Sequence, residues 1–261
     1  MKTSRHGAIR WVVVPDAAEA QGAGVAIEIE REKLKHLRKV LRTEWNEELR
    51  VIDGVGRVFR AVLEKRGDSG AARLEELLFT QPKLPETELV VCMPKNSTMD
   101  WIIEKAVECQ ATQVTPVVSS RSVVKPDRGD LAKYLHRWRM IADQALEQSE
   151  QAWHLRIAEP IEWKSWIKPV SKPSLVFSSE LRGQVEEKGA VQSLWGDLAN
   201  SKTQAVSLLI GPEGGFAPYE REELLASGWR EHSLGKMVLR VETAIVSALT
   251  LMRVSRLVSR S

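Results

Sequence analysis

The chain has 261 residues, a net charge of +3 at pH 7, 43% apolar residues and 28% charged residues, which is ordinary for one large or two small folded domains. Its two cysteines and five histidines lack the spacing of a disulfide framework or a zinc site, so we expect no metal. No uncharged apolar run approaches the length of a membrane span or a signal-peptide core, which predicts a cytoplasmic protein without a membrane partner.

The first eighty residues predict several short strands and one helix. We expect strands at residues 9–14, 25–29 and 73–79, and a hairpin whose turn is Asp53–Gly54. Apolar residues at helical spacing predict a helix over 30–41, with a buried face formed by Leu34, Leu37, Val40 and Leu41. This set of elements predicts a compact β-rich barrel over residues 1–80.

Positive charge is concentrated on this helix. Residues 31–42 hold six Lys and Arg against one Glu, a local balance of +5, while the rest of the chain sums to −2. Such a run is often only a solvated surface, but Lys and Arg also bind phosphates without reading sequence. Both interpretations stay open from composition alone; the residues concerned are Lys35, Arg38, Lys39 and Arg42.

A second domain is expected over residues 81–261, after a linker with two prolines at 81–87. Apolar runs at 89–93 and 114–118 flank a helix that a Ser97–Asp100 capping-box variant would begin. Strand, helix and strand at this spacing predict a parallel sheet. The pattern continues with strands near 175 and 205 and helices near 131–148, 191, 218 and 242–258. The first helix is expected to bury Ile102, Ile103, Ala106 and Val107.

The stretch Ser207–Phe216 predicts a buried strand followed by a glycine-rich loop, before a helix opening at Pro218. This is the usual place for a ligand in an open α/β sheet. The loop lacks the Lys and Ser/Thr of a phosphate-binding loop and the Gly-x-Gly-x-x-Gly of a dinucleotide site. It carries Glu213 instead, and acids follow in the first helical turn. These acids favour a ligand that is neutral or positive near the loop.

Two motifs together resemble a known family. Ile210–Phe216, followed by Ser233–Gly235 and Leu239–Ala244, resembles the RsmE-type ribosomal RNA uracil-N3 methyltransferases of the SPOUT superfamily. His36–Arg42 is similar to the motif of the family's PUA-like RNA-binding domain, and Arg10 matches a further position. The resemblance spans most of the chain, since three more stretches match: Met99–Ala106, Ser120–Lys125 and Ala145–Ser149.

The resemblance implies an α/β fold: a SPOUT-type parallel sheet with a C-terminal deep trefoil knot, preceded by a PUA-like β-barrel. It implies S-adenosyl-L-methionine as methyl donor and N3 of a specific uridine in small-subunit (16S) ribosomal RNA as acceptor. It also implies a homodimer that acts on ribosomal RNA within the small ribosomal subunit. N3 lies on the base-pairing edge, so the uridine must be unpaired or flipped out.

Site residues follow from the matched motifs. Arg240 is expected to stabilise negative charge on the uracil oxygens. Glu242 is a candidate proton acceptor, against a helix-capping role, and Glu213 is another, against the loop-forming role that we favour. Candidate cofactor-binding residues are Leu209, Gly211, Glu213, Gly214, Gly215, Ser233, Leu234, Gly235, Met237, Val238 and Leu239. Candidate RNA-binding residues are Arg10, Lys35, Arg38, Lys39, Arg42, Arg121 and Lys125.

The chain departs from the family pattern at a few positions. Val241 stands in place of Thr, Gln110 in place of the glycine that ends the first helix, and Trp153 near an expected Arg and Pro. Two alternatives stay open. One is a SPOUT methyltransferase acting on a transfer RNA base or a ribose, since the cofactor fold is shared. The other, which these departures keep open, is an inactive RNA-binding assembly factor.

Overall fold

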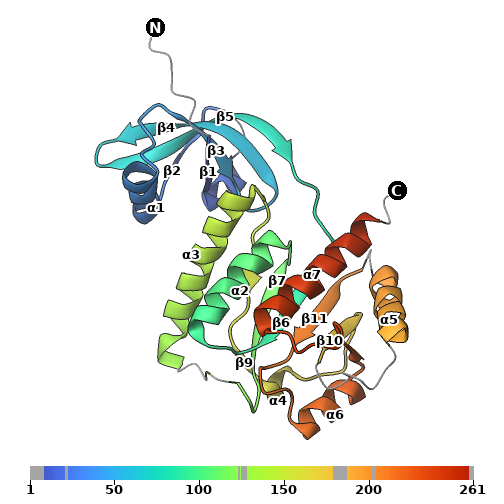
Figure 1. The fold of residues 1–261 in the computed structure, drawn as a ribbon. Helices are drawn as coiled ribbons and strands as arrows, with labels where there is room; N and C mark the ends of the chain where they lie inside the picture. Colours follow the sequence, from blue (N-terminus) through green and yellow to red (C-terminus); the bar gives the residue numbers. More distant parts are fainter. Residues whose placement is uncertain are drawn as a thin grey trace. The chain divides into compact units, whose positions relative to one another are not determined.

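A computed structural model describes residues 9–20, 23–122, 124, 128–178, 187–201 and 204–258. The chain divides into two compact units (Figure 1). One unit is Met1–Lys83 together with Leu146–His154, and the other is Leu84–Ala145 together with Leu155–Ser261.

The N-terminal unit is built on a five-stranded sheet in the order β1-β3-β4-β5-β2. β1 and β3 are parallel and the other pairs are antiparallel, including the predicted hairpin of β3 and β4. Alternate side chains form one core, which includes Val12, Leu49 and Leu63. The strands are β1 Arg10–Val13, β2 Ala26–Glu28, β3 Glu48–Ile52, β4 Arg57–Arg66 and β5 Ser69–Thr80.

The basic helix differs from a regular α-helix. It begins as α1 (Arg31–Lys35) and continues as a π-helical turn over His36–Val40. Leu34 and Leu37 are buried as predicted, but Val40 is 63% exposed. The wider turn is the reason, because a π-helix bonds each residue to the fifth along instead of the fourth and so rotates Val40 off the apolar face.

A segment distant in sequence completes this unit. The backbone N–H of Gly56 donates to the carbonyl of Ala152 at 2.8 Å, and that of His154 donates to Gly54 at 2.9 Å. Gly54 has φ 79° and a Cβ there would lie 1.8 Å from the His154 ring, so the close approach requires glycine. Glu147, one of the family-matched residues, accepts the backbone N–H of Val13 at 2.9 Å. Its role is therefore structural here.

The C-terminal unit contains a seven-stranded sheet in the order β12-β10-β11-β6-β7-β8, with β9 also paired to β7. Every pair is parallel, as the alternation of strands and helices predicts. The short strands β8, β9 and β12 were not predicted. The strands are β6 Thr87–Cys92, β7 Gln113–Val118, β8 Arg156–Ile157, β9 Ile161–Glu162, β10 Ser174–Phe177, β11 Val206–Ile210 and β12 Arg230–His232.

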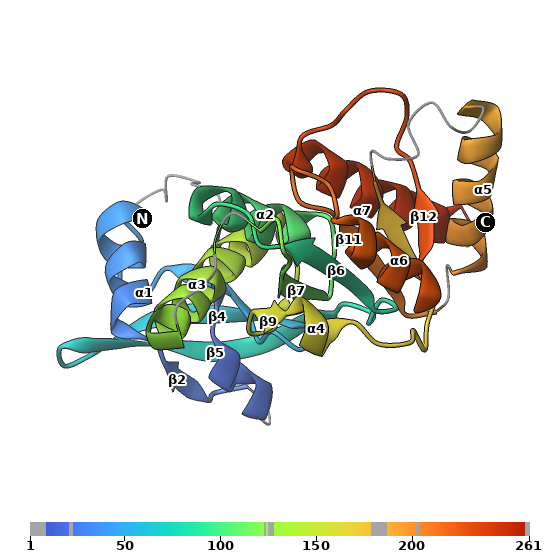
Figure 2. The same ribbon diagram turned by 90° about the horizontal axis from the view of Figure 1, so that it is seen from below.

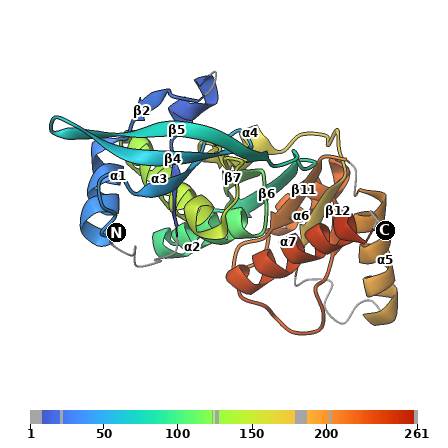
Figure 3. The ribbon, with the colours of Figure 1, turned by 90° about the horizontal axis from the view of Figure 1, so that it is seen from above.

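Helices cover both faces of this sheet. One face buries Val90, Val176 and Leu209 against Trp163 and Leu224, which lie on α4 and α6. The other carries α2 and α7, which pack against one another (Figures 1 and 3). The helices are α2 Asn96–Glu108, α3 Leu131–Ser149, α4 Trp163–Trp166, α5 Glu187–Asn200, α6 Pro218–Ala226 and α7 Val241–Leu257. Among the described residues, no helix is both long and apolar enough to span a bilayer.

The N-terminus of α2 corrects one prediction. The four residues expected inward are buried, but the helix begins one residue before Ser97 and its N-cap is Lys95, without a side-chain capping bond. Ser97 is exposed in the first turn, and Asp100 pairs with Arg137 of α3. The predicted capping box is therefore absent, because both of its residues lie inside the helix.

The C-terminus of α2 shows how the chain turns without the family's glycine. Gln110 takes φ 64°, the left-handed conformation. Its N–H donates to Val107 at 2.9 Å, while the N–H of Ala111 donates to Ala106 at 2.8 Å. These two bonds form a Schellman motif, in which glycine is the preferred residue at the position of Gln110.

We predict that Gln110→Gly raises the free energy of unfolding by about 0.5–1 kcal/mol, since it removes Cβ strain at a cost in unfolded-chain entropy. Urea unfolding of the full chain measures the change through the shift in midpoint. Gln110→Ala is the matched control, because it shortens the side chain yet retains the Cβ, and it should give no gain. Equal midpoints for the parent and the glycine variant would contradict this account.

Candidate functional site

A cavity lies at the carboxyl ends of β10, β11 and β12 and has a volume of about 420 Å3. We call it the strand-end pocket. The chain leaves β12 and runs as a long loop into α7 (Figure 2). Residues of this loop form much of the pocket wall. Ligands of open α/β sheets bind at this end of the strands, and the volume falls in the range of about 300–1,000 Å3 for small-molecule sites.

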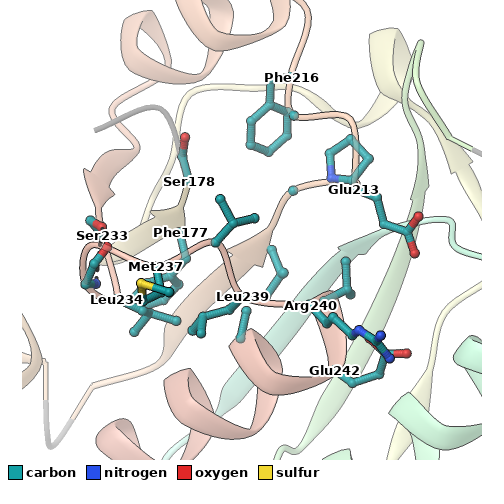
Figure 4. Close-up of a pocket in the computed structure, with 18 residues that line it drawn as sticks. Phe177, Ser178, Glu213, Phe216, Ser233, Leu234, Met237, Leu239, Arg240 and Glu242 are labelled. Atoms are coloured by element: carbon teal, nitrogen blue, oxygen red, sulfur yellow. Dashed lines mark hydrogen bonds between the residues drawn. The ribbon is translucent and has the colours of Figure 1, made fainter. Parts of the chain in front are cut away.

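Most of the candidate cofactor residues line this pocket (Figure 4). Two do not: Leu209 is buried in the apolar core, and the carbonyl of Gly214 accepts a hydrogen bond from Arg121. The structure thus brings together the two motifs, which sixteen residues separate in sequence. The candidates that line the pocket are Gly211, Glu213, Gly215, Ser233, Leu234, Gly235, Met237, Val238, Leu239, Arg240 and Glu242.

The glycine loop is shaped by Phe216. Its ring lies so close to the backbone of Gly211 that a Cβ there would be 2.8 Å from the ring. Phe216 is 2% exposed and packs against Trp163, with ring centroids 5.9 Å apart. Gly215 has φ 71° and its N–H donates to Pro212 at 2.8 Å, which closes the turn. The packing of Phe216 therefore anchors the loop to the apolar core.

Two further contacts fix the loop to the chain after β7. The carboxylate of Glu220, fully buried, accepts the backbone N–H of Ala217 at 2.9 Å and that of Ser120 at 2.7 Å. Arg121, a candidate RNA contact, donates to the carbonyl of Gly214 at 2.5 Å. Arg121 thus supports the glycine loop directly, a role that its motif did not suggest.

Fewer acidic residues face the pocket than the sequence of the loop and the following helix suggests. Glu220 faces backbone N–H groups, and Glu223 accepts the indole N–H of Trp163 at 2.7 Å. The acids that line the pocket are Glu213 and Glu242. A positive ligand therefore meets these two carboxylates, not the helix acids as a group.

The wall opposite the glycine loop depends on β12. His232, 5% exposed, has Nε2 2.9 Å from Asp197 of α5, and burial lowers its pKa, so the ring is neutral at pH 7 and Nε2–H donates. Directly after it, Ser233 Oγ donates to the carbonyl of Gly235 at 2.9 Å, in a turn where Gly235 has φ 122°. The sequence analysis did not predict β12. The alternation of strands and helices could have indicated it, because a further parallel strand is expected after α6.

Arg240 and Glu242 lie side by side at one end of the pocket, with the Glu213 carboxylate nearby (Figure 4). Arg240 is the exposed N-cap residue of α7 and Glu242 is in its first turn. Within the described residues, neither side chain makes a hydrogen bond or an ion pair. The capping role considered for Glu242 is therefore not observed, and both charged groups are available to a ligand.

The apolar surroundings exclude Cys92 as a nucleophile. It is buried, and burial raises its pKa to about 12, so the thiol stays protonated at neutral pH. In the described part of the chain, no group of three or more His, Cys, Asp and Glu is placed to hold a metal ion. What the pocket offers is a shaped apolar wall, backbone polar groups and the charged pair Arg240 and Glu242.

The candidate RNA contacts of the N-terminal unit separate into two kinds. Lys35, Lys39 and Arg42 are exposed, whereas the Arg38 guanidinium lies 4.5 Å from the Trp45 ring centroid and donates to the carbonyl of Thr43. Arg38 therefore supports the turn after the helix. Arg10 is half-buried at the start of β1, and Lys125 lies outside the described residues.

Known proteins were compared with this chain. Residues 81–253 match the family described as RNA methyltransferase domain, and residues 29–76 match the RNA methyltransferase PUA domain. Two solved structures share the fold. A methyltransferase from Legionella pneumophila in complex with S-adenosylmethionine is 24% identical, with TM-score 0.82, covering 95% of this chain and 98% of the other. Ribosomal RNA small subunit methyltransferase E from Neisseria gonorrhoeae bound to S-adenosylmethionine is 24% identical, with TM-score 0.77, covering 94% and 97%.

Relatives found by sequence identify the family, whereas the two solved structures show only the fold. Ribosomal RNA small subunit methyltransferase E from Synechocystis is 32% identical over 246 residues, which are 93% of this chain and 76% of that protein. The protein of that name from Mycobacterium tuberculosis is 33% identical over 222 residues, 82% of this chain and 80% of the relative. The chain therefore belongs to the ribosomal RNA small subunit methyltransferase E family.

Proposed function

We propose that the protein transfers a methyl group from S-adenosyl-L-methionine to N3 of a specific uridine in 16S ribosomal RNA, and that it acts on the small ribosomal subunit as a cytoplasmic homodimer. The observation that carries the proposal is the strand-end pocket, where the glycine loop and the Ser233–Glu242 loop face one cavity with Arg240 and Glu242 at its end.

The proposal also includes a knot in the C-terminal unit and a closed barrel in the N-terminal unit. Residues 81–261 would pass through a deep trefoil knot at the C-terminal end of the parallel sheet, and the five strands of residues 1–80 would close as a PUA-like barrel. Family membership supports both, together with the parallel order of the C-terminal sheet and the matched PUA domain.

The chemistry of the strand-end pocket fits the proposed methyl donor. S-adenosyl-L-methionine supplies an electrophilic methyl carbon on a positively charged sulfur. Leu234 and Leu239 provide apolar walls for an adenosine moiety, and Glu213 lies where a cation is favoured over an anion. Gly211 and Phe216 both border this pocket, and the absence of a side chain at Gly211 lets the Phe216 ring pack on its backbone.

Arg240 and Glu242 have different roles in the reaction of the acceptor base. Glu242 takes the N3 proton, and the guanidinium of Arg240 stabilises the negative charge that spreads onto the uracil oxygens. The N3 electron pair forms the new bond to the methyl carbon while the electron pair of the carbon–sulfur bond goes to sulfur, leaving a neutral thioether. Alignment of the reacting atoms supplies much of the acceleration.

Mass spectrometry of ribosomal and transfer RNA from a deletion strain tests the function directly. We expect one methyluridine to be absent from 16S RNA and restored by the cloned gene. A missing methyl group in transfer RNA or on a ribose would instead favour the related enzymes, and no change in any RNA would favour an inactive assembly factor.

We predict that Arg240→Ala lowers kcat by about 10²–10³-fold, the effect of losing one preorganised donor to a developing charge. Its affinity for S-adenosyl-L-methionine, measured by isothermal titration, should stay within about twofold of the parent, since cofactor affinity rests on other pocket residues. Arg253→Ala, an exposed arginine on the same helix, is the control and should change neither quantity. Full turnover by the Arg240 variant would remove this residue from the mechanism.

We also predict that Lys35→Glu combined with Lys39→Glu weakens RNA binding and reduces the slope of log K against log salt by about 1.4–1.8, the loss of two phosphate contacts. Filter binding with 16S RNA between 50 and 200 mM salt, roughly the range over which such contacts act, measures it. Lys65→Glu with Arg66→Glu, exposed at the β4–β5 turn, makes the same charge change in the same unit. Equal slopes for the two double variants would mean that the helix is only a solvated surface.

A further inference from the structure

A second pocket, more open to solvent, borders the strand-end pocket. It has a volume of about 420 Å3 and lies between the first turn of α2 and the start of α7, so we call it the α2–α7 pocket. Its lining residues are Ser97, Thr98, Trp101, Arg240, Glu242 and Thr243. Arg240 and Glu242 line both cavities, so the two pockets meet at this charged pair.

The polar side chains of this pocket are not used by the fold. α2 has no side-chain cap, and the hydroxyls of Ser97 and Thr98 make no hydrogen bond to any residue that the structure describes. Both lie on the first turn, on the side of the helix that also carries Trp101. These hydroxyls are therefore free to donate to a ligand's oxygens.

Trp101 is placed differently from the aromatic residues in the core of this unit. Trp163 is 3% exposed and packs with Trp166 and Phe216 in the core, as structural aromatics do. Trp101 is half-buried, borders the cavity, and has the ammonium of Lys105 6.0 Å from its ring centroid. A half-exposed indole at a cavity offers a flat surface on which another ring can stack.

We propose that the α2–α7 pocket holds the uracil base of the acceptor nucleotide, an inference that rests on the proposed function. The flipped base would stack on Trp101, with its carbonyl oxygens facing the hydroxyls of Ser97 and Thr98. Its N3 edge then points to Arg240 and Glu242, on the other side of which lies the strand-end pocket. This placement explains why one arginine and one glutamate border two cavities.

Kinetics of the full chain on 16S RNA from the deletion strain test the assignment. Trp101→Leu should lower kcat/KM roughly 5- to 150-fold, the loss expected when a base–aromatic stack is removed. Its affinity for S-adenosyl-L-methionine should not change, because the indole borders only the second pocket. Trp101→Phe should recover most of the loss, since a phenyl ring also stacks. Trp195→Leu, a 40%-exposed tryptophan on α5, is the matched control and should behave as the parent.

A second variant covers the case in which Trp101→Leu does not fold. Ser97→Ala with Thr98→Val keeps the size of the exposed side chains and should lower kcat/KM roughly 2- to 12-fold for each hydrogen bond lost. If the parent methylates no RNA, the proposed function fails. If the parent is active and a folded Trp101→Leu or Ser97/Thr98 variant retains kcat/KM within twofold, the base is held elsewhere and this inference alone is overturned.

Discussion

The close packing of Phe216 on the backbone of Gly211 is the constraint on which the site depends. A side chain at position 211 would meet the ring, so the strand can turn sharply only because glycine stands there. The ring itself is anchored in the core against Trp163. Glu220 and Arg121 then join the loop to the chain after β7. The loop is thus held by the core and by the chain after β7, while Gly211, Glu213 and Gly215 border the strand-end pocket.

The charged pair at the end of the Ser233–Glu242 loop differs from the glycine loop because its side chains are not held by partners. The side chains of Arg240 and Glu242 make no hydrogen bond or ion pair with the rest of the described chain, yet they stand at the start of a long helix that fixes their positions. Side chains held in place but not neutralised suit a reaction in which charge develops during the step. The buried acid of the loop, Glu220, is the opposite case, because backbone N–H groups satisfy its carboxylate completely.

The departures from the family pattern mostly concern the scaffold. Gln110 completes a Schellman motif despite its Cβ, and Trp153 packs against Gly56 while its indole N–H donates to Gln81 at 3.1 Å. Neither residue lines the strand-end pocket or the α2–α7 pocket. Val241 does border the strand-end pocket, but it is 7% exposed and retains its backbone groups. The features that made an inactive protein conceivable therefore leave the charged pair and the cavity in place.

Local sequence signals determined the parallel sheet and the glycine loop, because apolar periodicity and backbone freedom are properties of neighbouring residues. The candidate site residues came from the motifs that resemble a known family, and most of the candidate cofactor residues line one pocket. Tertiary structure decided what depends on distant partners. The bond of Asp197 to His232, the support of Gly214 by Arg121 and the docking of Glu147 on Val13 join residues 35, 93 and 134 positions apart. The π-helical turn that exposes Val40 is likewise invisible to a periodicity of 3.6 residues. No pattern along the chain encodes such pairings, since each is fixed only when the packed elements bring its two partners together.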